Sequence, residues 1–334
     1  MAESFLSAVN STLEAAAEGT LDEDEFSMSA DYDDSTAPSW CSLSSSVARH
    51  SYENGRRYHY YRQGHYPFPN DDQEQSKEEF KHLLSLELFN GRLFFSPIGD
   101  HPQRIMDFGT GIGSWAVEMA EKYPGAEVLG VDLSPIQPRF CPPNLRFHVD
   151  NIEEPWAYGS EYDLVHLRHM GYLLKEPIKL LTSTYENLKS GGCIEFQDLR
   201  PTIRCDDGTL PPDYAGCIFL DLLDQSLSKV FGFDTDFVQR VPMELERAGF
   251  INVRQIVYKV PIGTWTRDDK MRYIGWMSRE ALIYHLQSVG LKPLLSLGCC
   301  PNDTNRLISK VEQQSNDRTI HAYLEFAVVY GQKP

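Results

Sequence analysis

An acid and three alternating glycines stand out between residues 104 and 119, which read RIMDFGTGIGSWAVEM. The apolar run ends in Asp107, and Gly109, Gly111 and Gly113 follow at every second position. A strand that runs through a glycine-rich turn into a helix predicts a ligand site at the carboxyl edge of a parallel sheet. Glycine lets the backbone approach that ligand closely and adopt φ angles that other residues avoid.

The spacing of this turn separates two classes of ligand. Dinucleotide-binding turns have the pattern G-x-G-x-x-G, with a pyrophosphate at the helix N-terminus. Here the pattern is G-x-G-x-G, and position 114 is Ser. The carboxylate of Asp107 repels a pyrophosphate and favours a cation. S-adenosylmethionine carries an ammonium and a sulfonium but no phosphate, so it fits both observations.

Three further strand ends carry side chains suited to the same ligand. Asp132 ends EVLGVD, at a position where an acid accepts hydrogen bonds from ribose hydroxyls. Asp150 and Asn151 stand at the end of the next strand, and together with Ile152 they are expected to contact an adenine. The fourth strand, within DLVHLRHM at 163–170, is expected to end beside the sulfur of the cofactor. Four strand ends with these side chains in this order are much more specific evidence for S-adenosylmethionine binding than a single glycine-rich turn.

The elements that position these residues alternate along the chain. Strands are predicted at 104–108, 127–133, 145–150, 162–167, 193–198, 253–260 and 321–331. Helices are predicted at 75–92, 112–123, 177–189, 213–230 and 235–248, and helical patterning recurs at 267–290 and 303–315. Alternating strands and helices predict right-handed βαβ units and a parallel sheet with helices on both faces.

Charge and composition differ between the N-terminus and the remaining chain. The 334 residues have a net charge of −17, but residues 1–48 hold ten acids and no Lys or Arg. We expect 1–48 to be an acidic disordered tail, which either only solvates the protein or binds a protein partner. No cluster of Lys and Arg predicts phosphate-backbone contacts, so no direct nucleic-acid binding is expected.

Cysteine usage and hydropathy favour an intracellular protein. The seven cysteines are an odd number without zinc-ligand spacing, which indicates reduced thiols and no metal site. The N-terminus has no signal-peptide pattern, and no apolar run is long enough to span a membrane. We therefore expect a cytoplasmic or nuclear location, no secretion and no membrane association.

Two segments outside the alternating part are candidates for covering the site. Residues 49–92 are first dense in Tyr, His and Arg and then helical, and we expect them to form a helical lid segment. Tyr66 in this lid is placed to contact a sulfonium through its ring face, although such aromatics also often only anchor a helix to the core. Residues 264–320 form a helical insertion that either walls an apolar acceptor pocket or packs as a cap or dimer surface. The remaining residues from 93 to 334 are assigned to the main domain.

The sequence also resembles a known family, the seven-stranded class I methyltransferases, and within it the LaeA-like group of fungal secondary metabolism. The resemblance runs from about residue 50 to residue 334 and rests on YHYYRQGHYPFPND, FFSPIG, MDFGTGIGSWAVEMAEKYPGAEVLGVDLSPIQP, PPNLRFHVD, LKSGGCIEFQD and HAYLEFAVVYGQKP. It implies a Rossmann-like α/β sheet of seven strands, mostly parallel with the last strand antiparallel, helices on both faces and a helical insertion before the last strand. Where the group usually has Thr and a second acid, this chain has Ile112 and Asn151.

The expected cofactor is S-adenosyl-L-methionine. The resemblance and the strand ends together give the cofactor-binding set Tyr66, Asp107, Gly109, Thr110, Gly111, Gly113, Trp115, Asp132, Leu133, Asp150, Asn151, Ile152 and His166.

Methyl transfer from a sulfonium needs alignment and desolvation of the acceptor, and a general base only where the acceptor loses a proton early. The catalytic candidates are His166, His169 and Asp198, at the ends of the fourth and fifth strands. Glu195 on the fifth strand is a weaker candidate, since it also suits a structural ion pair.

Three functions remain open on the sequence. The favoured one is methylation of an O, N or carboxylate of a small-molecule natural product. The second is a LaeA-like nuclear regulator that binds the cofactor and acts through protein partners. The third is an enzyme of the same fold, such as a cyclase, that transfers no methyl group.

Overall fold

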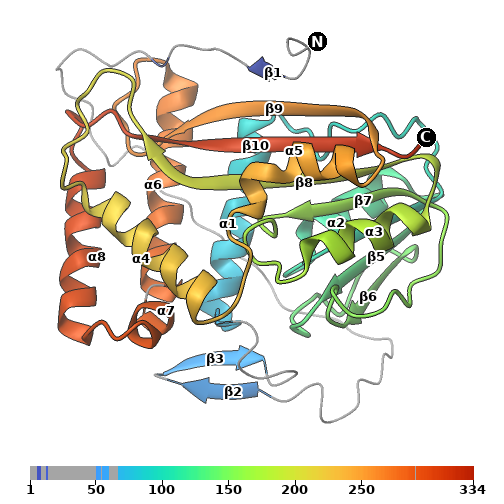
Figure 1. The fold of residues 1–334 in the computed structure, drawn as a ribbon, viewed down its shortest axis with the longest axis horizontal. Coiled ribbons are helices and arrows are strands. Elements are labelled where there is room, and N and C mark those ends of the chain that lie inside the picture. Colours follow the sequence, from blue (N-terminus) through green and yellow to red (C-terminus); the bar gives the residue numbers. More distant parts are fainter. Residues whose placement is uncertain (1–5, 9–12, 14–49, 54, 60–66, 290) are drawn as a thin grey trace.

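The computed structural model describes residues 6–8, 13, 50–53, 55–59, 67–289 and 291–334 (Figure 1). Its strands are β1 (Leu6–Ala8), β2 (His50–Glu53), β3 (Arg56–His59), β4 (Arg104–Phe108), β5 (Glu127–Asp132), β6 (Leu145–Val149), β7 (Tyr162–Arg168), β8 (Leu188–Arg204), β9 (Ile251–Pro261) and β10 (Tyr323–Gln332). The main sheet has the order β1-β9-β10-β8-β7-β4-β5-β6.

The sheet has the topology expected from the sequence. Strands β4 to β8 pair in parallel, whereas β10 lies antiparallel between β8 and β9. This arrangement confirms the mostly parallel seven-stranded sheet with an antiparallel last strand. The short strand β1 adds an eighth member, parallel to residues 255–257 of β9.

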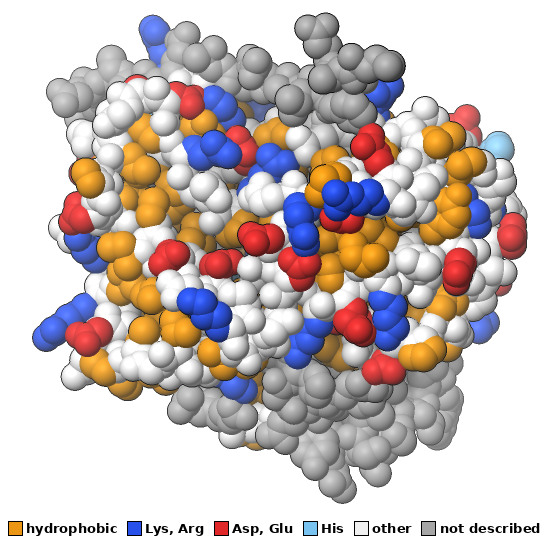
Figure 2. Space-filling model, in the orientation of Figure 1, with side chains coloured by type: hydrophobic (Ala, Val, Ile, Leu, Met, Phe, Trp, Pro, Cys, Tyr) orange, Lys and Arg blue, Asp and Glu red, His pale blue; other side chains and the backbone are white. Residues whose placement is uncertain are grey.

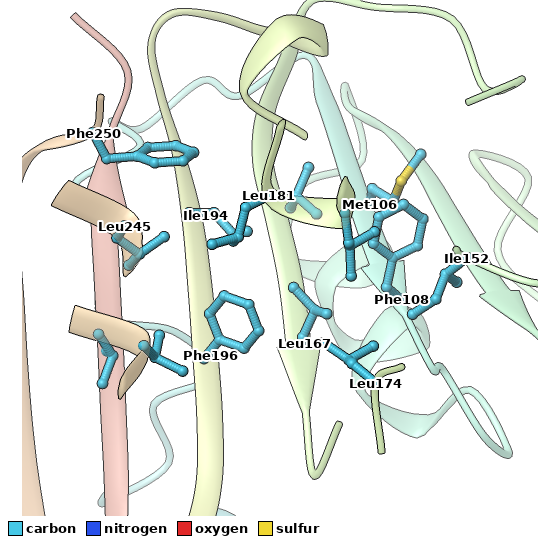
Figure 3. Close-up of a cluster of buried hydrophobic side chains, with 14 of the residues drawn as sticks. Met106, Phe108, Ile152, Leu167, Leu174, Leu181, Ile194, Phe196, Leu245 and Phe250 are labelled. Atoms are coloured by element: carbon cyan, nitrogen blue, oxygen red, sulfur yellow. The ribbon is translucent and has the colours of Figure 1, made fainter. Parts of the chain in front are cut away.

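Helices cover both faces of the sheet because neighbouring residues of each strand point to opposite sides. On one side, Ile105 packs in a cluster with Trp115 and Met119 of α2 (Ser114–Lys122), and α1 (Asp72–Leu88) lies beside α2. On the other side, Met106 shares a cluster with residues of α3 (Pro177–Asn187) and α5 (Phe237–Arg247). Figure 3 shows the second cluster, with labelled side chains from β4 (Met106, Phe108), β7 (Leu167), β8 (Ile194, Phe196) and α5 (Leu245).

A layer of helices stands at the carboxyl edge of the parallel strands, on the left of Figure 1. It consists of α4 (Ala215–Lys229), α6 (Asp269–Val289), α7 (Leu291–Ser296) and α8 (Pro301–Ser315). Phe219 and Leu223 of α4 and Val311 of α8 belong to its buried core. Helices α6 to α8 occupy the predicted insertion between β9 and β10.

The segment before α1 is fixed to the N-terminus of that helix. Strands β2 and β3 pair as an antiparallel hairpin. Arg56 of β3 binds the carboxylate of Asp71 at 2.5 and 2.8 Å, and Asp71 caps α1 by accepting a hydrogen bond from the backbone N–H of Glu74. The guanidinium of Arg57 donates to the backbone oxygen of Asn70 at 2.8 Å. These contacts hold the start of α1 in place.

The structure differs from the predicted elements at a few places. Strand β8 begins at Leu188 rather than at 193, because Gly191 and Gly192 pass through the strand instead of ending it. A side chain at Gly192 would meet the backbone oxygen of Tyr162 at 2.5 Å, which explains a glycine inside paired backbone. The helix α7 and the β2–β3 hairpin were not predicted.

Two surface properties bear on the partners of the protein. Within the described residues, no helix is long and apolar enough to cross a membrane. Figure 2 shows Lys and Arg side chains next to Asp and Glu side chains on the visible face, rather than gathered in one basic patch. The six cysteines in the described part of the chain are free thiols.

Candidate active site

The glycine turn between β4 and α2 has the backbone conformation that its sequence predicts. Gly109, Gly111 and Gly113 have φ angles of 70°, 57° and 85°, a region that side chains disfavour. A Cβ at Gly109 would lie 2.4 Å from the sulfur of Met170, and a Cβ at Gly113 would lie 2.6 Å from the ring of Phe147. At Gly111 the nearest such atom is an oxygen of Glu78 at 3.9 Å. The middle glycine therefore faces open space.

Asp107 is fixed by two neighbours beneath this turn. One carboxylate oxygen accepts from the hydroxyl of Thr110 at 2.6 Å, and the other lies 2.7 Å from Nδ1 of His166. The His166 ring is fully buried and stacks on Trp115 at a centroid distance of 3.7 Å. Trp115 in turn donates to the backbone oxygen of Leu93 at 2.8 Å. Thr110, Trp115 and His166 thus surround Asp107, and their direct contact with the cofactor stays a prediction.

Asp132 supports the turn from the end of β5. Its two carboxylate oxygens each accept a backbone N–H at 2.8 Å, one from Gly111 and one from Ser134. Burial raises the pKa of Asp132 to about 6, although these two hydrogen bonds act to lower it. The side chain lines both of the cavities that meet at this strand end.

The first of these, which we call the strand-end cavity, has a volume of about 90 Å³. It brings together the predicted residues Gly109, Asp132, Leu133, Asp150, Asn151 and Ile152. Asp150 is held by the hydroxyl of Tyr158 at 2.8 Å, while the side-chain oxygen of Asn151 accepts from the backbone N–H of Glu153 at 3.1 Å. The carboxyl ends of β4, β5 and β6 thus form one pocket, as their sequence predicts.

The second, the central cavity, has a volume of about 80 Å³ and shares Gly109, Asp132, Met170 and Leu173 with the first. Residues that the sequence did not single out line its other side, among them Glu78 and Lys81 of α1 and Arg168 of β7. Lys81 Nζ lies 2.7 Å from a carboxylate oxygen of Glu78. Burial acts against the ionisation of Glu78, but the positive charges of Lys81 and Lys77 leave its pKa lowered.

Arg168 is oriented by a hydrogen-bonded relay. Its guanidinium donates to Nδ1 of His82 at 2.8 Å, and Nε2 of His82 lies 2.7 Å from Glu118 of α2. Because arginine only donates, His82 carries its proton on Nε2 and donates it to Glu118. Burial and the charge of Arg168 lower the pKa of His82, which keeps the imidazole neutral. The relay joins α1, α2 and β7 around the central cavity.

A third hollow, the apolar cavity, lies between α1, α4, α6 and the sheet and has a volume of about 120 Å³. Its apolar lining includes Leu84, Leu88, Leu199, Leu220, Leu223, Val260, Leu282 and Phe326. Lys81, His169, Tyr172 and His285 line both this cavity and the central one. The two cavities therefore meet at these four side chains.

The three predicted catalytic residues lie in different surroundings. His169 lies at the junction of the two cavities with a φ of 58°, and its backbone N–H donates to Gln197 at 3.0 Å. His166 lines none of the three cavities. Asp198 is also buried away from them, where it accepts from the N–H of Gly171 at 3.0 Å and supports the loop after β7. Of these three residues, only His169 lines one of the cavities described above, and a catalytic role for each of them stays a prediction.

The structure shows the surroundings of Glu195 but does not describe Tyr66. Glu195 accepts the backbone N–H groups of Phe95 and Ser96 at 2.9 and 2.7 Å, so it anchors the loop before β4 instead of pairing with a base. Tyr66 lies outside the described residues, and its contact with a sulfonium stays a prediction. His285, which the sequence reasoning missed, reaches the junction from α6.

The chain matches known proteins over most of its length. Residues 80–255 match a family model described as a methyltransferase domain. Over 301 residues the chain is 35% identical to methyltransferase pytC from Aspergillus terreus, covering 90% of this chain and 93% of that protein. The chain belongs to the methyltransferase family.

Other relatives place it within the LaeA-like group. The secondary metabolism regulator LAE1 of Cochliobolus heterostrophus is 34% identical, covering 84% of this chain and 94% of its own. The protein-methionine methyltransferase laeA of Emericella nidulans is 31% identical, covering 84% and 76%. The cofactor of this methyltransferase family member is S-adenosylmethionine.

The residues present fit that cofactor. The open face of Gly111 would let the protein backbone approach the cofactor closely. The carboxylate oxygens of Asp132 would be available to ribose hydroxyls. Asp150, Asn151 and Ile152 line the strand-end cavity and would offer polar and apolar contacts to an adenine. Glu78 and Arg168 offer one charge of each sign to the amino-acid end.

Proposed function

We propose that this methyltransferase-family protein methylates a small molecule held in the apolar cavity, in fungal secondary metabolism. One observation carries the proposal: Lys81, His169, Tyr172 and His285 line both the cofactor side and the apolar cavity. A methyl donor in the central cavity and an acceptor in the apolar cavity would meet there. We place this activity in the cytoplasm or nucleus.

The cofactor supplies an activated methyl group, so the chain has to bind the reactants, align them and remove water from around them. Asp132 and the residues after β6 hold the nucleoside, and the glycine turn brings the backbone against it. The relay from Arg168 through His82 to Glu118 fixes the far end of the central cavity. The walls from α1, α4 and α6 exclude water from the acceptor.

Two measurements test the proposal together. Calorimetric titration with S-adenosylmethionine and S-adenosylhomocysteine is expected to show binding of both. Incubation of the protein with S-adenosylmethionine and fungal metabolite extracts is expected to yield a product heavier by one methylene unit. Binding without any methylated product in extracts of many fungi would count against a small-molecule acceptor.

The variant Ala281→Leu separates the acceptor side from the cofactor side. Ala281 lines the apolar cavity and not the other two, so the larger side chain takes up acceptor space. Methyl transfer should fall strongly while binding of S-adenosylhomocysteine stays unchanged. Tyr284→Leu, an exposed position on the same helix, is the matched control. Undiminished transfer in Ala281→Leu would contradict the assignment of this cavity.

A second candidate function is regulation through protein partners. It is favoured by the identity to LAE1, a protein named as a secondary metabolism regulator, and residues 1–48 offer an acidic arm for such contacts. A pull-down from nuclear extract in which a partner binds the full chain, and not a chain without residues 1–48, would support it. The absence of a tail-dependent partner would contradict it.

A further inference from the structure

Tyr172 lies where the central and the apolar cavities meet. It belongs to the loop between β7 and α3, and its side chain lines both cavities. It packs against the core of the helical layer that contains Phe219 and Leu223 of α4. The backbone N–H of its neighbour Gly171 donates to Asp198 of β8 at 3.0 Å, which fixes the loop against the sheet. The side chain therefore has a defined place at the junction.

The hydroxyl of Tyr172 makes no hydrogen bond to the described part of the chain. Tyrosine hydroxyls inside proteins usually have a hydrogen-bond partner. Tyr158 shows the usual arrangement, since its hydroxyl donates to Asp150 at 2.8 Å. A hydroxyl that borders two cavities without such a partner is available to a ligand.

The surroundings keep this hydroxyl protonated. Burial raises the pKa of Tyr172 above its ordinary value, and the negative charges of Asp198, Glu78 and Glu74 raise it further. Over the physiological pH range the group is therefore a neutral phenol, which has one proton to donate. A ligand that satisfies this proton has to present a hydrogen-bond acceptor.

The charged side chains near the junction are engaged with one another. Their contacts are Lys77 with Glu74, Lys81 with Glu78, and Arg168 with His82. Of the charged groups in these contacts, only Lys81 also lines the apolar cavity, to which Asp224 adds a carboxylate. His169 and His285 are uncharged, because burial lowers their pKa well below its ordinary value.

These charges discriminate between acceptor groups. A carboxylate would lose its hydration in the apolar cavity, where Lys81 already pairs with Glu78 and Asp224 adds negative charge. An ammonium would be attracted by Asp224, but it has no atom that accepts the proton of Tyr172. An uncharged oxygen accepts that proton and brings no charge into the cavity.

The volume limits the size of the part that is buried. An apolar cavity of about 150 Å³ accommodates one benzene molecule. The apolar cavity, at about 120 Å³, is therefore suited to one ring or a short aliphatic segment.

We propose that Tyr172 selects the acceptor, by donating a hydrogen bond to a carbonyl oxygen of an uncharged, apolar, one-ring compound. A carbonyl oxygen accepts a hydrogen bond and has no proton of its own, so it matches a group that donates. Because Tyr172 also borders the central cavity, this bond holds the carbonyl end of the acceptor toward the methyl donor, and the ring fills the apolar cavity behind it. This inference rests on the proposed function.

The test uses the full-length protein saturated with S-adenosylhomocysteine. Cyclohexanone and methylenecyclohexane share one ring, and only the first has an oxygen. Their dissociation constants are measured by calorimetry and by ligand-observed NMR, in the unmodified protein and in Tyr172→Phe, which removes the hydroxyl and keeps the ring. Methylenecyclohexane leaves water more readily, so the informative quantity is the change in the ratio of the two constants. We expect the affinity of cyclohexanone relative to methylenecyclohexane to fall by about three- to tenfold in Tyr172→Phe, the effect of one neutral hydrogen bond.

Further variants and probes locate this effect. Tyr284→Phe, at an exposed position on α6, is the matched control and should leave the ratio unchanged. Ala281→Leu, which narrows the apolar cavity, should weaken both probes. Cyclohexylammonium and cyclohexanecarboxylate, the charged comparisons with the same ring, should bind more weakly than cyclohexanone.

The stability of Tyr172→Phe and its affinity for the cofactor product separate this role from others. Because the hydroxyl has no partner in the described part of the chain, its removal should not lower the melting temperature of the ligand-free protein. The affinity for S-adenosylhomocysteine should also stay unchanged. A lower melting temperature would indicate a structural role for the hydroxyl, and weaker S-adenosylhomocysteine binding would indicate a cofactor contact. Either result would contradict the inference.

Several probe results would overturn the inference as well. These are an unchanged ratio in Tyr172→Phe, unchanged probe affinity in Ala281→Leu, tighter binding of a charged probe than of cyclohexanone, or no binding of any probe. Each would leave the proposed function standing as long as S-adenosylhomocysteine binds. Failure of S-adenosylhomocysteine to bind the folded protein would instead remove the proposed function itself, and the inference with it.

Discussion

Replacing Asp132 by Asn removes a charge from the site while keeping the shape of the side chain. In the protein, both carboxylate oxygens accept backbone N–H groups at 2.8 Å, from Gly111 and Ser134. An amide has one acceptor oxygen, so its NH₂ group would face one of these two N–H groups. The substitution therefore weakens both the glycine turn and the contact with the ribose hydroxyls.

The magnitude follows from the type of hydrogen bond that is lost. Hydrogen bonds to charged groups contribute about 1.5–3 kcal/mol. Losing one such bond to the ribose raises the dissociation constant of S-adenosylhomocysteine by about tenfold to 150-fold. Calorimetry on Asp132→Asn measures this change, and Asp100→Asn removes the same charge at an exposed position as the control.

The pH dependence gives an independent measure of the same carboxylate. Burial raises the pKa of Asp132 to about 6 from the usual 3.8, so the carboxyl becomes protonated as the pH falls through about 6. A protonated carboxyl loses the charge that strengthens its bonds to ribose, and affinity should fall below that pH by at most about tenfold per unit. The Asn variant should lack this dependence. An affinity of the unmodified protein that is flat from about pH 7 to about pH 5 would refute the role of Asp132.

Three further predictions concern the turn, the amino-acid end of the cofactor and the loop after β7. Gly113→Ala should unfold at a lower temperature than Gly111→Ala, because only the first would also place a Cβ 2.6 Å from the half-buried ring of Phe147; equal melting temperatures would contradict this packing. Arg168→Met should weaken S-adenosylhomocysteine by about tenfold or more, but not 5′-methylthioadenosine, which lacks the amino-acid end; equal losses for both ligands would exclude a carboxylate contact. Burial raises the pKa of Asp198 to about 7 from 3.8, so the stability from its proton is fully present below about pH 3.8 and is lost as the pH rises to about 7. Denaturant titrations should therefore show a loss of at most about 1.4 kcal/mol per pH unit that is absent in Asp198→Asn.

The sequence predicts the parts of this protein whose signals are local. The strand ends at Asp107, Asp132 and Asp150 follow from short apolar runs that close in an acid, and the structure brings them to one edge. Parallel pairing places these ends together whatever the loops between them do. The backbone conformation of the glycine turn could also be predicted from the sequence, because glycine readily adopts the positive φ angles that the structure shows there.

Residues that reach the site from distant elements could not be predicted in this way. Lys77, Glu78 and Lys81 on α1 have the spacing of charges on a solvated helix face, and only the packing of α1 beside α2 and α6 places them at the central cavity. His285 reaches the junction through an insertion whose packing has no local signature. Arg168 did carry a signal, since a basic residue inside the apolar run DLVHLRHM is rarely left unpaired in a core.

The structure also changes which acid we expect to meet the cationic end of the cofactor. Asp107 is occupied by Thr110 and His166, whereas a carboxylate oxygen of Glu78 faces the open side of Gly111. We therefore predict that Glu78→Gln weakens S-adenosylmethionine and S-adenosylhomocysteine by about tenfold or more, through the loss of a charge-assisted contact with the ammonium.

The affinity for 5′-methylthioadenosine, which has no ammonium, should change little in Glu78→Gln. Glu79→Gln is the control, because Glu79 is the exposed neighbour on the same helix. If the Glu78 variant binds all three ligands as tightly as the unmodified protein, Asp107 rather than Glu78 is the acid that interacts with the cation. The preference of this turn for a cation over a pyrophosphate would then rest on the buried acid beneath it, as its sequence alone suggested.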